Sequence, residues 1–312
     1  GVEARLPYNR VLLSSLLAQD VADNEIDLKP ASWWRAKGVE LRSGERVVAI
    51  DPQARTVTLG DGSRLPWDKL VIATGSNAVR LPLPGADLPG VLTFRDCADV
   101  EQMRAAFKPG ARAAVIGGGL LGLEAAYGLA KADVDVTVVH VMDRLMERQL
   151  DPAAASLLKQ DLERRGIRVM LEAKTAANLG EGKADTLAFN DGQQIAVDMV
   201  VMAVGIAPNI ELAASAGLAT KRGVMVDDAM RSSIENIFAL GECAEHRGIA
   251  YGLVQPAYEQ ARVLACVLTG DEAAFKGVVS ATNLKVSGIG VFSAGDYLGE
   301  GAQVLMLQDR GL

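Results

Sequence analysis

The sequence predicts an α/β protein built from two similar units, and three features of the chain lead to this prediction. The first is a glycine-rich stretch between two short apolar runs, and the second is an internal repeat of about 40 residues. The third is the composition: with 312 residues, of which 49% are hydrophobic, the chain can form about two domains with sizeable cores.

The composition also excludes several classes of function. A net charge of −7 without a basic run argues against a nucleic-acid surface. No apolar window is long enough to cross a membrane, so we predict no membrane contact. The 3 cysteines lie far apart in the sequence, which predicts neither a CxxC motif nor a disulfide-rich exterior and suggests a cytoplasmic protein. With only 2 histidines we also predict no metal in this chain.

The glycine-rich loop lies between two predicted strands. The apolar run from Ala113 to Ile116 predicts a buried parallel strand. The Leu- and Ala-rich segment from Leu120 to Ala132 predicts a helix, and the run from Val134 to Val139 predicts a second strand. This order of strand, turn, helix and strand is the context that a dinucleotide-binding loop requires.

Three glycines of the loop, Gly117, Gly119 and Gly122, form the pattern GxGxxG. The first allows a tight turn, the second lets the backbone approach a pyrophosphate, and the third lets helix and strand pack closely. The N-terminus of the helix, with Leu120 and Leu121, offers unpaired N–H groups to phosphate oxygens. We therefore predict dinucleotide binding here; the alternative is a tight turn without a ligand.

The second strand ends at His140, where this fold commonly carries an Asp or Glu that binds a ribose 2′-hydroxyl. A histidine, or the nearby Arg144, could instead accept a 2′-phosphate. The alternative is that His140 is a surface residue at the end of a strand. The sequence leaves the choice between NADH and NADPH open, with NADH slightly favoured.

The internal repeat relates two stretches that begin at Gly38 and Gly166. Each contains a strand, a hairpin that turns at Asp-Gly, and an apolar strand that ends in a glycine, at Gly75 and at Gly205. The Asp-Gly turns and the closing glycines are each offset by 130 residues, and the opening glycines by 128. Such a register predicts two copies of one supersecondary unit.

The repeat also predicts where a first glycine loop should lie. In the second copy the GxGxxG precedes the repeat, and an offset of 130 residues from Gly117 falls before residue 1. We therefore expect the corresponding strand, loop and helix of the first copy to lie in a segment that this chain lacks.

The motifs LVIATGS, GGGLLGLE, VMAVGIAPN and NIFALGE occur in this order. They resemble those of flavoproteins with two dinucleotide-binding domains, the family of glutathione, rubredoxin and ferredoxin reductases. The resemblance implies two Rossmann-like (three-layer ββα) domains of the glutathione-reductase type, plus the start of a small α+β C-terminal domain. It implies an FAD-binding-type domain at 1–100 and 220–270, an NAD(P)H-binding domain at 101–219, and an incomplete C-terminal reductase domain at 271–312.

A narrower set of stretches, including RLPYNRVLLS, ALGECAEHRGIAYGLVQP and KVSGIGVFSAGD, is similar to the large subunits of NAD(P)H-dependent assimilatory nitrite reductases. This resemblance implies FAD and NAD(P)H as cofactors. It also implies an electron acceptor, either a sirohaem or iron–sulfur centre or a small redox protein. A homodimer is one expected assembly.

The resemblance also implies roles for individual residues. The FAD contacts would be Asn9, Arg10, Val47, Ala73, Thr74, Gly75, Gly241, Glu242, Gln255 and Pro256. Among these, Glu242 would bind the ribityl hydroxyls, and Gln255-Pro256 would begin a helix, Ala257 to Leu268, facing the flavin. Glu124 would lie beneath the nicotinamide, and Gly205 would also contact NAD(P)H.

Each of these roles has a plain structural alternative. Asn9 and Arg10 could cap the following helix, and Val47 could belong to the core. Glu242 could be a helix N-cap, the Gln255-Pro256 pair an ordinary helix start, and Glu124 a solvated residue.

Hydride transfer needs no protein nucleophile, so we predict no catalytic side chain. The cysteines Cys97, Cys243 and Cys266 do not form a close pair in sequence, which disfavours disulfide reduction. The first hypothesis is an FAD-dependent NAD(P)H oxidoreductase module that passes electrons to a nitrite-reducing metal centre. The alternatives are a rubredoxin- or ferredoxin-type reductase, and a flavin-free NAD(P)-binding fragment without activity.

Overall fold

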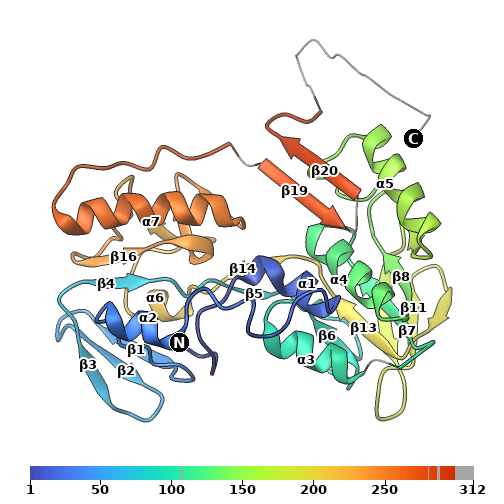
Figure 1. The fold of residues 1–312 in the computed structure, drawn as a ribbon, viewed down its shortest axis with the longest axis horizontal. Coiled ribbons are helices and arrows are strands. Elements are labelled where there is room, and N and C mark those ends of the chain that lie inside the picture. Colours follow the sequence, from blue (N-terminus) through green and yellow to red (C-terminus); the bar gives the residue numbers. More distant parts are fainter. Residues whose placement is uncertain (107, 280, 287–288, 299–312) are drawn as a thin grey trace. The chain divides into compact units, whose positions relative to one another are not determined.

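The computed structural model describes residues 1–106, 108–279, 281–286 and 289–298. The chain forms two compact units (Figure 1). The first unit consists of Gly1–Arg80, Thr93–Ala105 and Val204–Val278. The second unit consists of Leu81–Leu92, Ala106–Ala203 and the described part of Val279–Leu312. No helix among the described residues has the length and apolar character needed to cross a membrane.

The second unit contains a five-stranded sheet with the order β6-β13-β7-β8-β9. Its strands are β6 (Val91–Thr93), β7 (Arg112–Ile116), β8 (Asp135–Val139), β9 (Arg168–Met170) and β13 (Met199–Met202). The pairs β13–β7, β7–β8 and β8–β9 are parallel. The central strands are almost entirely buried and apolar, as expected for a parallel sheet covered on both faces.

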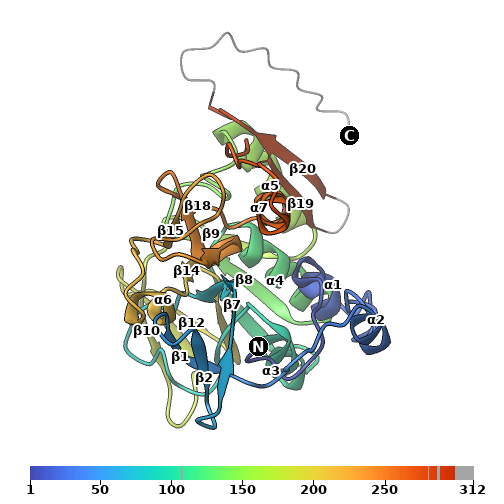
Figure 2. The ribbon, with the colours of Figure 1, turned by 90° about the vertical axis from the view of Figure 1, so that its left-hand side faces the viewer.

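The second unit also contains two longer helices, α4 and α5. Helix α4 (Leu120–Lys131) follows β7 directly and packs on β7 and β8 (Figure 2). Helix α5 (Pro152–Arg164) is capped by Asp151, whose side chain accepts the N–H of Ala154 at 2.7 Å. The predicted strand–turn–helix–strand order of the glycine loop is confirmed, with the helix ending one residue earlier than predicted.

Each unit also contains a three-stranded antiparallel meander. The first unit has β1 (Val47–Asp51), β2 (Thr56–Leu59) and β3 (Arg64–Pro66), and the second has β10 (Thr175–Leu179), β11 (Thr186–Phe189) and β12 (Gln194–Ala196). Both meanders turn at the predicted Asp-Gly pairs, where Gly62 and Gly192 have φ of +86° and +87°. In both, the first strand pairs with the second through a bulge at the matching place. The predicted repeat is therefore confirmed at the level of register.

The first unit also contains short strands, β4 and β15 to β18, that form small sheets. β4 (Leu70–Ile72) pairs in parallel with β16 (Ile237–Ala239). β15 (Val224–Val226), β17 (Ala244–His246) and β18 (Ile249–Ala250) form another sheet. Helix α7 (Val254–Thr269) packs its Leu264 into the same apolar cluster as Phe238 of β16. It ends at Gly270, whose φ of +96° favours glycine.

The remaining helical segments of the first unit are short. They are the 3₁₀ turns η1 (Arg10–Leu12) and η2 (Gly241–Cys243), and the helices α1 (Leu13–Leu17), α2 (Ala31–Ala36), α3 (Cys97–Ala105) and α6 (Glu211–Ser215). Helix α1 buries three leucines and packs against α3, while α6 packs against β1. These contacts tie residues 93–105 and 204–219 to the first unit.

The observed units differ from the predicted boundaries in several places. Residues 81–92 belong to the second unit, and residues 101–105 and 271–278 belong to the first. Residues 204–219 belong to the first unit because β14 (Ile206–Pro208) pairs with β5 (Ser76–Ala78) and α6 contacts β1. In the C-terminal region, β19 (Ala281–Val286) and β20 (Ile289–Ala294) form an antiparallel hairpin within the second unit. The last part of the predicted C-terminal domain, 299–312, lies outside the described residues.

Candidate cofactor-binding sites

The glycine loop of the second unit joins β7 to α4 in a tight turn. Gly117 has a φ of +122°, which favours glycine. A Cβ at Gly122 would lie 2.0 Å from the carbonyl oxygen of Gly117, so only glycine allows this approach of helix and loop. A Cβ at Gly119 would meet nothing within 4 Å. In this loop, protein atoms therefore leave no room for a side chain at Gly122, whereas the space beside Gly119 is open.

The N-terminus of α4 has no side-chain cap. Its N-cap residue is Gly119, which has no side chain, so no side chain accepts the first N–H groups of the helix. Leu120 is half-buried and Leu121 is 37% exposed at this end. Glu124, one turn further along, is half-buried. Uncapped N–H groups beside an open glycine form a donor set suited to a pyrophosphate.

His140 lies directly behind this loop and is only 8% exposed. Its Nδ1 accepts the N–H of Gly118 at 3.0 Å, and its Nε2 lies 3.1 Å from Oε2 of Glu147. The interpretation of His140 as a surface residue is therefore wrong, because β8 carries the ring inward under the loop. Sequence reasoning missed Gly118 and Glu147. The one available signal was the middle one of three consecutive glycines, Gly118, at a position that the GxGxxG pattern leaves free.

In the first unit, Glu242 is the centre of a polar network at the end of β16. Its carboxylate forms an ion pair with Arg95, and the side chains of these two residues are 22% and 15% exposed. It also accepts the hydroxyl of Ser76 at 2.8 Å, and Nε of Arg95 donates to the Ser76 carbonyl at 3.0 Å. A Cβ at Gly75 would lie 3.9 Å from this carboxylate. Ser76 directly follows the ATG motif, whereas no motif marked Arg95.

Glu242 does not act as a helix N-cap. It lies inside the turn η2, whose N-cap is Leu240. The N–H of the preceding Gly241 donates to Oε1 of Gln260 at 2.7 Å, and Gln260 is fully buried on α7. A side chain of α7 therefore fixes the turn η2 through its first N–H. Gln260 is another residue that sequence reasoning missed.

Residues at the end of the ATG strand contact the segment that follows the closing glycine of the second repeat. Thr74 donates its hydroxyl to the carbonyl of Asn209 at 2.8 Å, and the Asn209 amide donates to the Thr74 carbonyl at 2.9 Å. Ala73 is exposed. The carbonyl of Gly205 accepts the N–H of Val79 at 3.0 Å. Gly205 belongs to the first unit, and its contact with NAD(P)H stays a prediction.

The N-terminal residues Asn9 and Arg10 have different roles. The Asn9 side chain caps η1 by accepting the N–H of Val11 at 3.2 Å, as the structural alternative predicted. Arg10 donates to the Arg95 carbonyl at 2.9 Å and pairs with Glu3, which connects it to the network around Glu242. Burial and the hydrogen bond to Glu3 raise the pKa of the neighbouring Tyr8 hydroxyl, which therefore stays protonated.

Helix α7 and strand β1 carry the last predicted contacts. Helix α7 begins at Val254, three residues before the predicted start, because proline fits the first turn of a helix. Gln255 is exposed and Pro256 is buried in that turn. No side chain caps the helix. Val47 is half-buried and packs against the core of the first unit.

The residues present fit the two expected cofactors to different degrees. For a dinucleotide in the second unit, the open Gly119 and the uncapped α4 supply space and donors. For a flavin in the first unit, the Glu242 carboxylate could accept ribityl hydroxyls and the uncapped start of α7 could face the ring. However, Arg95 and Ser76 already contact this carboxylate, so a ligand there would share it.

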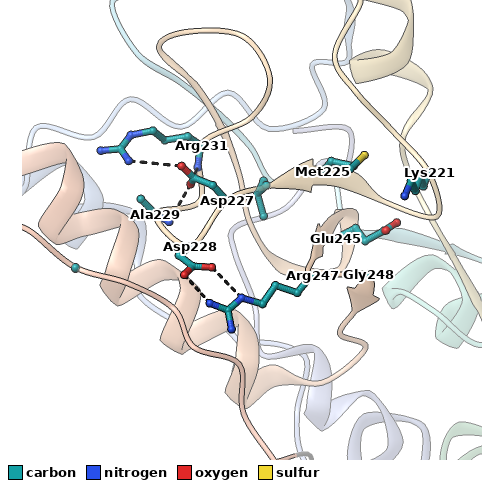
Figure 3. A pocket seen from close by; sticks show the side chains of 11 residues that line it. Lys221, Met225, Asp227, Asp228, Ala229, Arg231, Glu245, Arg247 and Gly248 are labelled. Atoms are coloured by element: carbon teal, nitrogen blue, oxygen red, sulfur yellow. Dashed lines mark hydrogen bonds and ion pairs between the residues drawn. The ribbon is translucent and has the colours of Figure 1, made fainter.

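The first unit also has a cavity of about 570 Å³ that none of the predicted cofactor residues lines (Figure 3). Its rim pairs Asp228 with Arg247 at 2.6 Å and Asp227 with Arg231 at 3.6 Å. Arg247, followed by His246, holds the pKa of the Asp228 carboxyl below its usual range. No cluster of metal-ligating side chains occurs among the described residues.

Comparisons with known proteins now place the chain in a family. The model of the pyridine nucleotide-disulphide oxidoreductases matches residues 1–261, so the chain belongs to that family.

Two curated relatives and one solved structure show how far the similarity extends. The chain is 48% identical over 299 residues to nitrite reductase [NAD(P)H] of Bacillus subtilis, covering 95% of this chain and 37% of the relative. It is 35% identical to the benzene 1,2-dioxygenase system ferredoxin–NAD(+) reductase subunit of Pseudomonas putida, covering 98% and 75%. The crystal structure of NADH:rubredoxin oxidoreductase from Clostridium acetobutylicum matches with a TM-score of 0.80 at 29% identity, covering 95% and 74%.

These matches confirm the predicted family resemblance and α/β fold. The chain spans between 31% and 37% of the length of the nitrite reductase relatives that it matches.

Proposed function

We propose that the chain is the electron-input module of an FAD-dependent NAD(P)H oxidoreductase. The observation that carries this proposal is the glycine loop of the second unit, where Gly119 opens outward at the uncapped N-terminus of α4. Main-chain N–H groups at such a helix end stabilise a pyrophosphate through hydrogen bonds and the helix dipole. We assign NAD(P)H to this loop, with Gly117, Gly119 and Gly122 shaping it.

FAD is assigned to the first unit. There Glu242 and Gly75 lie together at the ends of β16 and β4, where ligands of α/β sheets commonly bind. Arg95 and Ser76 hold the carboxylate of Glu242 in place. FAD, when bound, supplies a hydride acceptor for NAD(P)H and passes electrons onward singly or in pairs.

NADH is favoured over NADPH. The 2′-phosphate of NADPH calls for a free cationic side chain at the end of β8. The His140 ring is buried there, and its nitrogens already contact Gly118 and Glu147. Arg144, the nearby alternative, pairs with Asp143 at 3.0 Å. The end of this strand therefore presents no uncommitted positive charge from the two residues that the sequence had suggested.

A nitrite-reducing metal centre is the proposed electron acceptor. The support is the 48% identity to a nitrite reductase over nearly the whole chain. A ferredoxin-type protein is the second candidate, because the chain covers 75% of a ferredoxin–NAD(+) reductase subunit. The two candidates share the same half-reaction and differ in the partner alone. The described cysteines Cys97, Cys243 and Cys266 are unpaired, in keeping with an acceptor other than a disulfide of this chain.

The test is a visible absorption spectrum of the purified chain before and after addition of FAD and desalting, followed by anaerobic NADH. Retained flavin bands near roughly 380 and 450 nm that bleach with NADH would support the proposal. Retained flavin that NADH does not bleach would contradict hydride transfer within this chain. A colourless protein that still binds NADH would instead support a flavin-free NAD(P)-binding fragment.

A further inference from the structure

His140 makes both of its ring contacts within the second unit, and one of them is to the glycine loop. The Gly118 N–H donates to Nδ1 at 3.0 Å in a buried setting. The carbonyl of Gly118 accepts the N–H of Met146 at 2.9 Å. Both main-chain polar groups of Gly118 are therefore used inside the protein, directly before the open Gly119.

These contacts define the tautomer of the ring. Because a main-chain N–H can only donate, Nδ1 must be the unprotonated acceptor, and the ring proton must lie on Nε2. Nε2 is 3.1 Å from Oε2 of Glu147, which can accept that proton's hydrogen bond. His140 is thus a neutral link between the loop and a carboxylate.

The shape of the loop depends on the same ring. A Cβ at Gly118 would lie 2.7 Å from Cγ and 2.9 Å from Cδ2 of His140, and 2.7 Å from Cδ2 of Leu145. The leucine methyl can rotate away, whereas Cγ of the imidazole moves only by rotation about the Cα–Cβ bond of His140, which would also withdraw Nδ1 from the Gly118 N–H. The observed position of the His140 ring therefore requires glycine at position 118.

We propose that His140 is a positioning residue for the coenzyme: it holds the Gly118 N–H and thereby orients the peptides of Gly119 and Leu120 toward the pyrophosphate. This inference rests on the proposed binding of NAD(P)H at the loop. His140 acts on the pyrophosphate half of the coenzyme, which NADH and NADPH share. It does not read the 2′ substituent that distinguishes them.

The experiment compares His140→Leu with His140→Asn by titration with NADH and with NADPH. Leucine removes the acceptor, whereas Oδ1 of asparagine can replace Nδ1. We expect His140→Leu to raise the Kd of both coenzymes by the same factor, on the order of tenfold for one lost buried hydrogen bond. His140→Asn should stay within about threefold of the wild type. Val141→Ala, at the 56% exposed neighbour, is the matched control.

Hydrogen–deuterium exchange without coenzyme provides a second readout. The peptide that contains Gly118 should lose protection in His140→Leu and keep it in His140→Asn. Circular dichroism and thermal unfolding establish that each variant is folded. If His140→Leu does not fold, Glu147→Leu tests the same link from its other end, and we expect it also to raise both Kd values equally.

Three results would overturn the inference. A change in the NADH-to-NADPH affinity ratio of about tenfold in His140→Leu would show that the ring reads the 2′ group. Unchanged affinities with unchanged exchange would show that the ring does not position the loop. A wild-type chain that binds neither coenzyme would remove the proposed function as well, and the wild-type titration separates that result from the other two.

Discussion

Substitution of Gly122 by alanine should separate helix α4 from the loop that precedes it. The added Cβ would lie 2.0 Å from the carbonyl oxygen and 3.0 Å from the carbonyl carbon of Gly117. Contacts under 3.0 Å essentially never occur for a real Cβ, so the two segments must move apart by at least 1.0 Å. The clashing atoms belong to the backbone, so no side-chain rotation can relieve the overlap.

The cost of this movement can be estimated from two opposing effects. Overpacking costs about 1–3 kcal/mol, and an approach to 2.0 Å of a backbone atom lies in the upper part of that range, at about 2–3 kcal/mol. Alanine recovers up to about 1 kcal/mol of helix propensity relative to glycine. We therefore expect Gly122→Ala to lower the free energy of unfolding by about 1–2 kcal/mol, and to weaken NADH binding because the N–H groups of α4 no longer face the loop.

Gly119→Ala is the matched control because it makes the same chemical change three residues away. Its Cβ would meet nothing within 4 Å, and its φ of −88° suits any residue. We expect the free energy of unfolding to change by no more than about 0.5 kcal/mol. NADH affinity should still fall, since the methyl group would fill the space through which the pyrophosphate approaches.

The assay is urea denaturation followed by far-UV circular dichroism, with hydrogen–deuterium exchange of the α4 peptide and an NADH titration for each variant. An unfolding midpoint for Gly122→Ala equal to or above that of the wild type would refute the steric argument. Equal midpoints for the two variants would show that the contact at Gly117 does not distinguish them. Unchanged NADH affinity in Gly119→Ala would refute the assignment of the pyrophosphate to this loop.

Three further predictions concern other parts of the chain. Glu242→Ala should weaken FAD retention at least tenfold in a desalting assay, whereas Glu242→Gln, which keeps one acceptor oxygen, should retain more flavin; equal retention would contradict the role of the carboxylate. Gly85→Ala should destabilise the chain by more than about 1 kcal/mol in urea denaturation, because φ is +73° and the Cβ would lie 2.0 Å from the Asn178 carbonyl oxygen; wild-type stability would contradict this. Asp228 has a depressed pKa because of Arg247, so its stabilising contribution is present above its unfolded value of about 3.9 and is lost as pH falls through the folded value. Asp228→Asn should therefore flatten the pH dependence of the unfolding midpoint below about pH 4, and an unchanged slope would contradict the assignment.

Much of the fold was predictable because its signals are local in sequence. Three glycines between two apolar runs predict the glycine loop. Asp-Gly turns, where a positive φ favours glycine, predict the meanders. The unit boundaries depend instead on pairing between distant strands. The pairing of β14 with β5 joins residues 128 to 132 apart in sequence, and the composition around the predicted boundary at residue 219 does not indicate it.

The same distinction between local patterns and distant contacts separates the site residues that were predicted from those that were missed. Gly122 was assigned from its pattern, and its close contact with Gly117 has the physical cause that the pattern implies. Arg95 and Gln260 were missed because each reaches its partner through tertiary packing, Arg95 from the segment before α3 and Gln260 from the buried face of α7. For His140 only the alternative of a surface residue was wrong, because sequence gives the end of a strand and not the direction of the side chain there.

The segments that follow the two closing glycines join the two copies of the repeat within the first unit. Gly75 and Gly205 are equivalent in the two copies, and the strands that follow them, β5 and β14, pair with each other in antiparallel fashion. The Gly75 carbonyl accepts the N–H of Asn209 at 2.9 Å, and the Gly205 carbonyl accepts the N–H of Val79 at 3.0 Å. The segment that follows each closing glycine therefore donates an N–H to the closing glycine of the other copy. One copy alone could not satisfy these backbone groups in this way. A substitution that breaks this pairing, such as Val79→Pro, removes one of these two N–H donors and should destabilise the first unit even though it changes no residue of either predicted cofactor site.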